Sequence, residues 1–531
     1  MTAHFDVVIR GGSVYDGSGG PPFVGDLAIA GDTIAAVGPR LGDATGRLEI
    51  DATGLAVSPG FINMLSWAQE TLIADGHSQS DIRQGVTLEV FGEGMSLGPL
   101  NPRMQQEQRN RQTDIQYPVT WRTLDDGLTA LTHRGVACNV ASFVGATTLR
   151  IHELEHADRP PTSKELDTMR GLLREAMQAG ALGLGSSLIY APAQYAQTDE
   201  LVALCEVVAE SGGMYISHIR NESNRLLEAI DELVEISRRA GVPAEIWHFK
   251  ASGPANWPRL DAAIERVEAA RDQGQRITAD MYTYAASSTG LDATMPGWVQ
   301  EGGHRAWVER LRAPSVRARL RQELSHDGDN EFLSAEKILL VGFRNPGLRG
   351  LTGKTLAEVA GERGTCVEDT IVDLVVEDDS RVQCVFFTMS EDNVRKAVGL
   401  PWMSFCSDAG SLAPSGVFLN TSTHPRAYGS FARLLAKYVR DEGVVRLAEA
   451  IRRLAALPAS NLGLSGRGQL RAGYFGDVVV FDPHAIQDHA TYERPHQYAT
   501  GVRHVFVNGA HVLREGEHTG AMPGRVVRRG G

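Results

Sequence analysis

Two hydrophobic patterns divide the chain. In the first 57 residues, short apolar runs such as FDVVIRGG and DLAIAG are separated by Gly and Asp, and the same pattern returns at 474–482 and 503–516. Alternating apolar and polar positions bounded by turn residues are typical of β-strands. Since neither end can build a core alone, we predict that residues 1–57 and 465–531 form one small β-sandwich domain.

Residues 58–464 follow a different pattern, in which short apolar strands alternate with longer amphipathic stretches. Strand candidates include GFINML, VTLEVF, MYIS, AEIWHF and WMSFCSD. Alternation repeated about eight times favours an α/β fold whose parallel strands close into a (β/α)8, or TIM-like, barrel over an open sheet. The segment at about 287–380 interrupts the pattern with Trp, Arg, Gly and an extra apolar run, KILLVGF. We interpret it as an insertion over the barrel mouth.

Composition and charge narrow the class of protein. The formal net charge of −13 over 531 residues disfavours nucleic acid or an anionic membrane as a partner. No apolar run reaches about 18 residues, so we expect no transmembrane helix. The N-terminus lacks a secretory signal, and five scattered cysteines do not suggest a disulfide framework. We therefore expect a cytoplasmic protein, either a monomer or a homo-oligomer.

Four polar side chains end apolar runs, at Glu93, His218, His248 and Asp408. In a barrel the carboxyl ends of all strands meet at one face, so these side chains are expected to converge. Each alone has an ordinary alternative: a structural histidine, a turn carboxylate between two glycines, or a helix cap at the aspartate. Taken together, the four residues favour a metal site.

The chemistry of this set is that of a metal-dependent hydrolase. Two neutral imidazoles and a carboxylate suit Zn²⁺ with one position open for water, although Mn, Co or Ni also fit. Such a metal lowers the pKa of water toward about 7 and polarises a carbonyl. An aspartate beside it, Asp408, can take the proton and deliver it to a leaving amine.

Other side chains are candidates for contact with substrate. Arg220 and Lys250 each follow a candidate histidine by two positions and can bind a carboxylate, although ion pairs with Glu222 or Glu245 are an equal alternative. Three tyrosines either line the pocket, and orient a carbonyl, or simply pack at the rim: Tyr190, Tyr282 and Tyr284.

These residues lie within motifs that resemble a known family. The chain is similar to the N-acyl-D-amino-acid deacylase (D-aminoacylase) branch of the amidohydrolase superfamily, nearly from end to end. The resemblance is carried by VVIRGGSVYDGSG, VSPGFI, GLGSSLIYAPAQYA, MYISHIRNES, EIWHFKASG, FCSDAG, THPRAYGSFARLL and GYFGDVVVFDP. It implies a barrel with a β-sandwich built from both termini, and hydrolysis of an amide next to a carboxylate.

The resemblance also implies roles for individual residues. His218 and His248 match the family's metal-binding histidines, and Asp408 matches its catalytic aspartate. Positions that the family associates with substrate correspond to Arg220, Lys250 and Tyr282. With a one-residue gap, Glu93 takes the place of a metal-binding cysteine, and a carboxylate is a reasonable substitute for a thiolate at zinc.

One motif departs from the family. Its His-x-His pair after the first barrel strand falls on Leu65 and Trp67, which cannot coordinate a metal. That pair serves one of two metal positions, so the resemblance implies one Zn²⁺ per chain at the other position. Trp67 would fill the vacated volume or form a wall of the substrate pocket.

Three functions remain open from the sequence. The first is a mononuclear amidohydrolase that acts on N-acyl-(D-)amino acids or related small amides. The second keeps the site but hydrolyses a cyclic amide, lactam or ester. The third is a non-catalytic homologue that binds a small molecule in the barrel mouth.

Overall fold

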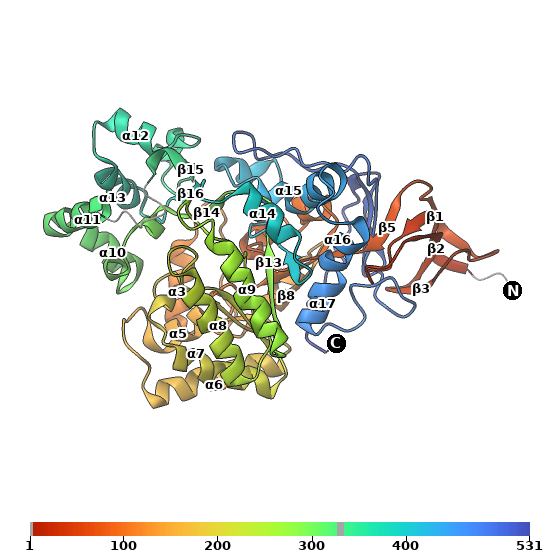
Figure 1. The fold of residues 1–531 in the computed structure, drawn as a ribbon, viewed down its shortest axis with the longest axis horizontal. Coiled ribbons are helices and arrows are strands. Elements are labelled where there is room, and N and C mark those ends of the chain that lie inside the picture. Colours follow the sequence, from red (N-terminus) through yellow and green to blue (C-terminus); the bar gives the residue numbers. More distant parts are fainter. Residues whose placement is uncertain (1–3, 327–333, 531) are drawn as a thin grey trace.

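The computed structural model describes residues 4–326 and 334–530. Figure 1 shows three parts: parallel strands surrounded by helices in the middle, a small helical unit at one end, and a sheet made from the chain termini at the other. Among the helices in these ranges, none is both long enough and apolar enough to cross a membrane.

Strands from both chain ends share one nine-stranded sheet, in the order β21-β20-β19-β18-β5-β1-β2-β3 with β4 beside β1. Strand β5 joins the two halves, since it pairs in parallel with β1 and antiparallel with β18. Apolar side chains from both ends pack on one face, as alternation along the strands requires. The strands are β1 (His4–Val14), β2 (Phe23–Ala30), β3 (Thr33–Gly38), β4 (Thr45–Asp51), β5 (Ala56–Pro59), β18 (Val478–Phe481), β19 (Val502–Val507), β20 (Ala510–Arg514) and β21 (Glu517–His518).

The central strands are parallel and form two arrays, β6-β7-β8 and β9-β10-β11-β12-β13-β17. Only Phe143 separates β8 from β9 in the chain. At the opposite edges, the Met64 N–H donates to the Phe405 carbonyl at 3.3 Å, which links the end of β6 to β17. The strands are β6 (Phe61–Asn63), β7 (Val86–Phe91), β8 (Asn139–Ser142), β9 (Val144–Gly145), β10 (Gly183–Ser187), β11 (Met214–His218), β12 (Ala244–Ile246), β13 (Ile277–Met281) and β17 (Met403–Phe405).

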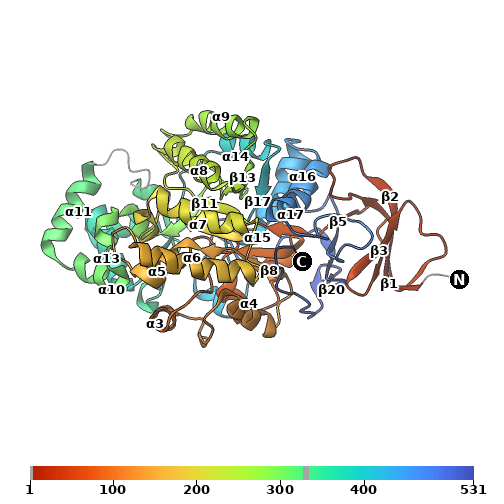
Figure 2. The same cartoon turned by 90° about the horizontal axis from the view of Figure 1, so that it is seen from below.

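Helices cover the outside of these strands, as the view in Figure 2 shows. Helix α8 illustrates the sequence pattern, since Leu226, Ile230 and Leu233 recur at helical spacing and are buried, and Gly241 ends the helix at φ +69°. The helices are α1 (Gln69–Ala74), α2 (Gln79–Ile82), α3 (Pro102–Arg111), α4 (Leu124–His133), α5 (Ala146–Leu154), α6 (Ser163–Gln178), α7 (Thr198–Glu210), α8 (Leu226–Ala240), α9 (Arg259–Asp272), α14 (Glu391–Val398), α15 (Arg426–Arg433), α16 (Leu447–Leu454) and α17 (Ala456–Leu462).

The segment that interrupts the barrel pattern forms a unit with a core of its own. A three-stranded antiparallel sheet, β14-β16-β15, packs with four helices around a separate apolar cluster. The unit runs to the end of β16, slightly beyond the boundary predicted near 380. Its elements are β14 (Ser287–Gly290), α10 (Gly303–Leu311), α11 (Pro314–His326), β15 (Ile338–Gly342), α12 (Leu356–Arg363), α13 (Val367–Asp378) and β16 (Gln383–Phe386).

Candidate metal centre

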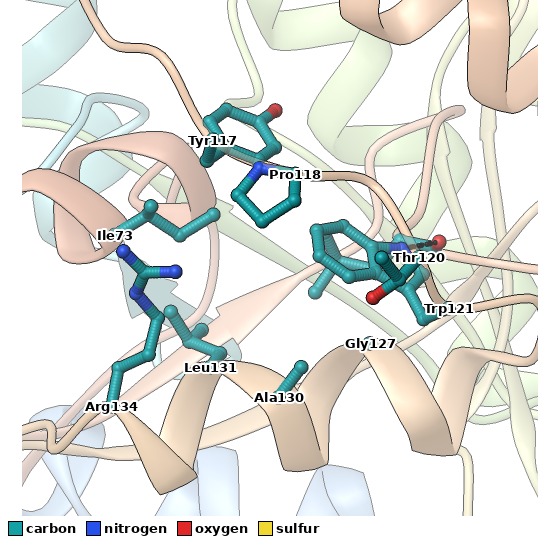
Figure 3. Close-up of a pocket in the computed structure, with 10 residues that line it drawn as sticks. Ile73, Tyr117, Pro118, Thr120, Trp121, Gly127, Ala130, Leu131 and Arg134 are labelled. Atoms are coloured by element: carbon teal, nitrogen blue, oxygen red, sulfur yellow. Dashed lines mark hydrogen bonds between the residues drawn. The ribbon is translucent and has the colours of Figure 1, made fainter.

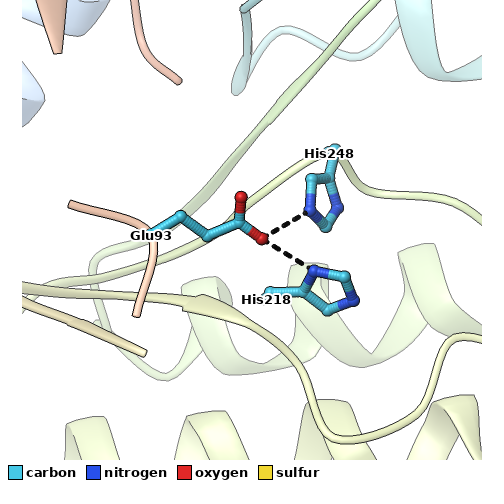
Figure 4. Close-up of side chains that lie close together, drawn as sticks. All are labelled: Glu93, His218 and His248. Atoms are coloured by element: carbon cyan, nitrogen blue, oxygen red, sulfur yellow. Dashed lines mark hydrogen bonds and ion pairs between the residues drawn. The ribbon is translucent and has the colours of Figure 1, made fainter. Parts of the chain in front are cut away.

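Three predicted ligands meet at the carboxyl ends of the barrel strands (Figure 4). Glu93 follows β7, His218 is the last residue of β11, and His248 lies two residues after β12. All three side chains are buried, and their ligand atoms lie within 4.8 Å of one another. Within residues 4–326 and 334–530, no other group of three His, Cys, Asp or Glu side chains meets this spacing.

One carboxylate oxygen faces both imidazoles. The Glu93 Oε1 atom lies 2.8 Å from Nδ1 of His218 and 3.2 Å from Nε2 of His248. The flanking glycines make this placement possible, since Gly92 and Gly94 adopt φ +112° and +67°. A Cβ at Gly92 would lie 2.5 Å from a backbone carbonyl oxygen, so a larger residue does not fit there.

A fourth group, the carboxylate of Glu222, lies behind both histidines. It is 3.0 Å from Nδ1 of His248 and 3.7 Å from Nε2 of His218, the nitrogens opposite those that face Glu93. The Lys250 Nζ donates to it at 2.6 Å and lies 2.8 Å from Nδ1 of His248. The sequence had suggested Glu222 only as an ion-pair partner; in the structure its carboxylate also faces both imidazoles, and it lies closer to His248 than to His218.

The charges in this cluster shift the pKa values of its members. Burial acts to raise the pKa of Glu93, but hydrogen bonds with His218 and His248 outweigh it and hold that pKa well below its usual range. For His248, burial and then Lys250 act to lower the pKa, but Glu222 and Glu93 outweigh them and raise it to about 10. Without a metal, the Glu93 carboxylate is therefore ionised and forms an ion pair with a protonated His248.

The donor set fits a metal ion. Two imidazole nitrogens and a carboxylate oxygen are the ligands of many zinc sites that keep one position open, and their mutual spacing suits a single ion. Histidines that bind metals usually donate their other N–H to a carboxylate, the place that Glu222 occupies here. Among the described residues, the buried Nε2 atom of His218 accepts or donates no hydrogen bond, and Glu222 faces it only at the longer distance of 3.7 Å.

Asp408 lies near the same mouth, held from two sides. Its Oδ1 accepts from the Trp67 indole N–H at 3.1 Å, and its Oδ2 forms an ion pair with Arg426 at 2.6 Å. Burial raises the pKa of Asp408, although Arg426 and His248 oppose the shift. Leu65, the other residue at the missing His-x-His pair, is fully buried among apolar side chains of the barrel interior.

The predicted substrate residues divide into two groups. The ring of Tyr190 meets the edge of His218 at a centroid distance of 5.2 Å, and Tyr282 lies beneath Arg426, whose guanidinium is 4.5 Å from the ring centroid. Arg220 points elsewhere: its guanidinium pairs with Glu232 at 2.8 Å and donates to two backbone carbonyls. The suggestion that Arg220 holds a substrate carboxylate is therefore not supported by its contacts.

The insertion contributes a cation that the sequence did not reveal. Arg381 lies 4.9 Å from the centroid of the Tyr190 ring and pairs with Asp292 at 2.9 Å. Its side chain is 41% exposed, so solvent reaches it although it contacts Tyr190. No periodicity links a residue just before β16 to the barrel, and only the fold brings them together.

A separate small cavity lies between α1 and α4 (Figure 3). Its volume is about 80 Å³, and most of its lining is apolar, with Ile73, Tyr117 and Trp121 around it and Arg134 at one side. None of the residues of the metal centre lines it. It therefore has no part in the arrangement around Glu93.

Comparisons with known proteins identify the family of this chain. Residues 419–513 match the model of the amidohydrolase family. The D-aminoacylase of Alcaligenes xylosoxydans xylosoxydans is 33% identical over 99% of this chain and 98% of its own. The structure of N-acyl-D-glutamate deacylase from Bordetella bronchiseptica, complexed with zinc and a phosphonate mimic of the tetrahedral intermediate, is 29% identical with a TM-score of 0.82, and covers 99% of this chain and 100% of that one.

A further similar structure is that of a D-aminoacylase with a binuclear metal centre, for which one-metal activation and second-metal attenuation are described. It is 31% identical, has a TM-score of 0.82 and covers 99% of this chain and 100% of that one. Fold and site together define an amidohydrolase, with a TIM-type barrel and an additional domain. Within that superfamily, the chain belongs to the D-aminoacylase family.

The contacts of Glu222 predict an effect on metal affinity. Replacing Glu222 with Gln keeps the shape but removes the charge that both imidazoles face. We expect the Kd for Zn²⁺ to rise about 10- to 100-fold, the usual result of losing such a carboxylate. Zinc competition with a chromophoric chelator measures this. Glu232→Gln, which alters the ion pair of Arg220 instead, is the control, and an equal loss in both variants would contradict the assignment.

The raised pKa of His248 predicts that metal uptake releases a proton. With a pKa of about 10, the metal-free imidazole is protonated at pH 7, whereas a metal binds only the neutral ring. Affinity should therefore rise with pH, by about tenfold per unit, up to that pKa. Calorimetric titration in buffers of different ionisation enthalpy counts the protons released, and a count of zero at pH 7 would refute this prediction.

Proposed function

We propose that this protein is a metal-dependent amidohydrolase that holds one divalent ion, most simply Zn²⁺, and hydrolyses N-acyl-D-amino acids. The observation that carries the proposal is the buried set of Glu93, His218 and His248 with Asp408 nearby at the same barrel mouth. The family relationship supplies the substrate class, since the relatives are named for the deacylation of D-amino acids.

The reaction divides between the ion and the chain. Zinc at Glu93, His218 and His248 would supply an acidified water and polarise the amide carbonyl. The Asp408 carboxylate would take a proton from the attacking water as the water oxygen bonds to the carbonyl carbon. When the C–N bond breaks, Asp408 returns the proton to the leaving nitrogen, which yields a carboxylate and a free amino acid. The raised pKa of Asp408 suits a group that must both accept and deliver a proton near neutrality.

A single ion follows from the residues at the first strand. Leu65 offers no ligand and is buried among apolar side chains, and Trp67 uses its only polar group to donate to Asp408. The metal position at Glu93, His218 and His248 needs neither Leu65 nor Trp67 as a ligand. One-metal activation is described for a structurally similar D-aminoacylase, which offers a precedent for catalysis with one ion.

Cations around the site suit a substrate carboxylate. Lys250 lies beside His248 at the metal centre, although Glu222 already neutralises much of its charge. Arg381 is more exposed and stands against Tyr190, which itself contacts His218. We assign the carboxylate of the amino acid to this side of the mouth, with Tyr190 and Tyr282 as walls.

The domain arrangement is proposed on the same basis. We propose that strands β6 to β13 and β17 close into one (β/α)8 barrel over residues 58–464, with residues 1–57 and 465–531 as the terminal β-domain. The link between Met64 and Phe405, and the likeness to D-aminoacylase structures, support this closure.

A substrate panel tests the function. Purified protein with one equivalent of zinc is assayed against N-acetyl-D-amino acids, their L enantiomers, and cyclic amides, lactams and esters. We expect hydrolysis confined to the D set. Turnover of a cyclic substrate alone would favour the second function considered from the sequence, and tight binding without turnover of any compound would favour the third.

A further inference from the structure

The two residues that replace the His-x-His pair lie directly beside Asp408. The backbone N–H of Asp408 donates to the Leu65 carbonyl at 2.9 Å, and the N–H of Trp67 donates to the Ala409 carbonyl at 3.0 Å. Ser66 and Ala409 form a parallel bridge between these segments. The position of residue 67 is therefore tied to the position of Asp408 through the main chain.

The side chains repeat this connection. The Trp67 indole N–H donates to Oδ1 of Asp408 at 3.1 Å, while Arg426 pairs with Oδ2 at 2.6 Å. One carboxylate oxygen thus accepts a hydrogen bond, and the other faces a guanidinium in an ion pair. A carboxylate turns easily about its last torsion, so a contact on one oxygen alone leaves its orientation loose, whereas a hydrogen bond on one oxygen and an ion pair on the other restrict it.

Asp408 also needs support from its surroundings. Its φ of +49° lies in the left-handed region, which residues other than glycine adopt only when neighbouring contacts hold them there. Arg426 is itself held, since its backbone N–H donates to His424 at 2.9 Å and its guanidinium stacks on Tyr282. Trp67 provides the corresponding anchor on the other oxygen.

We propose that Trp67 is a positioning residue, whose indole N–H together with Arg426 fixes the Asp408 carboxylate for proton transfer at a site without a second metal. The inference rests on the proposed function. It assigns to the 40% exposed Trp67 a contact with the proton carrier, in addition to the role as a pocket wall that the sequence suggested.

The test is the variant Trp67→Phe, which keeps an aromatic ring but removes the donor. We expect kcat to fall about tenfold, the loss typical of one hydrogen bond to a charged group, with KM for an N-acetyl-D-amino acid changed less than about twofold. Zinc content should stay the same. Trp298→Phe is the matched control, because Trp298 donates its indole N–H to a carboxylate, Glu323, at 2.8 Å within the insertion; its kcat should equal that of the unaltered protein.

A second measurement does not depend on activity. The chain has seven tryptophans, whose indole N–H groups give separate signals in a ¹H–¹⁵N spectrum. The signal lost in Trp67→Phe identifies Trp67, and it should shift in Asp408→Asn while the Trp298 signal does not.

The outcomes separate the two proposals. If the unaltered protein hydrolyses no substrate of the panel, the proposed function fails, and the spectrum still tests the contact. If it is active, an unchanged kcat in Trp67→Phe overturns the inference, as does a rise in KM alone, which would make Trp67 only a wall. A Trp67 indole N–H signal whose chemical shift is unchanged in Asp408→Asn overturns the inference as well.

Discussion

Replacing His248 with Ala is expected to remove the bound metal and lower kcat/KM by about 10³-fold or more. Without the metal, the attacking water is no longer acidified and the substrate carbonyl is no longer polarised. His248 contacts Glu93 on one side and Glu222 with Lys250 on the other, so its loss also leaves two buried carboxylates with fewer partners. Elemental analysis and initial rates on the same preparation measure both effects.

The matched control is His504→Ala, which removes a buried histidine from the terminal sheet, 3.2 Å from His511 and outside the metal centre. It should retain one equivalent of zinc and its activity. If His248→Ala keeps its zinc and its rate while the control is also intact, then His248 is not a ligand, and the metal centre described here is wrong.

Replacing Asp408 with Asn is expected to lower kcat about 10²- to 10⁴-fold, the contribution typical of general acid–base catalysis, with zinc retained. The amide keeps the hydrogen bond from Trp67 in shape but cannot accept the proton of the attacking water. Steady-state kinetics, together with zinc content, separates this result from the loss of metal expected for His248→Ala.

Asp477→Asn provides the comparison, because Asp477 is a buried aspartate paired with an arginine, Arg467, far from the barrel mouth. Any loss of activity in this control reflects stability alone and is visible as a lower Tm. Equal activity of Asp408→Asn and the unaltered protein would remove Asp408 from the mechanism.

The convergence of the three candidate metal ligands could be predicted because each lies at the end of a strand. Glu93, His218 and His248 each terminate an apolar run, and parallel strands present their carboxyl ends to one face. The ion pair of Arg220 with Glu232 could not be predicted, for a related reason. Side chains two residues apart point to the same face of a strand, so Arg220 would follow His218 only if the strand continued. Strand β11 ends at His218, however, and the Arg220 side chain points to Glu232.

The partners behind the site could not be predicted in the same way. Glu222 lies in the loop between β11 and α8, and Arg426 is the first residue of α15, so the rule that strand ends converge says nothing about either. Arg381 reaches Tyr190 from the insertion, whose packing depends on its own core. For Trp67, the sequence shows what the residue cannot do, namely bind a metal, but its hydrogen bond to Asp408 depends on the parallel pairing of two segments more than 300 residues apart.

The central claim, a deacylase that works with one metal ion, is tested most directly by titrating the metal-free protein with Zn²⁺ while hydrolysis of an N-acetyl-D-amino acid is followed. The account predicts that activity rises linearly and reaches its plateau at about one equivalent per chain. A plateau only at two equivalents, or full activity before any zinc is added to protein shown to be metal-free, would contradict it.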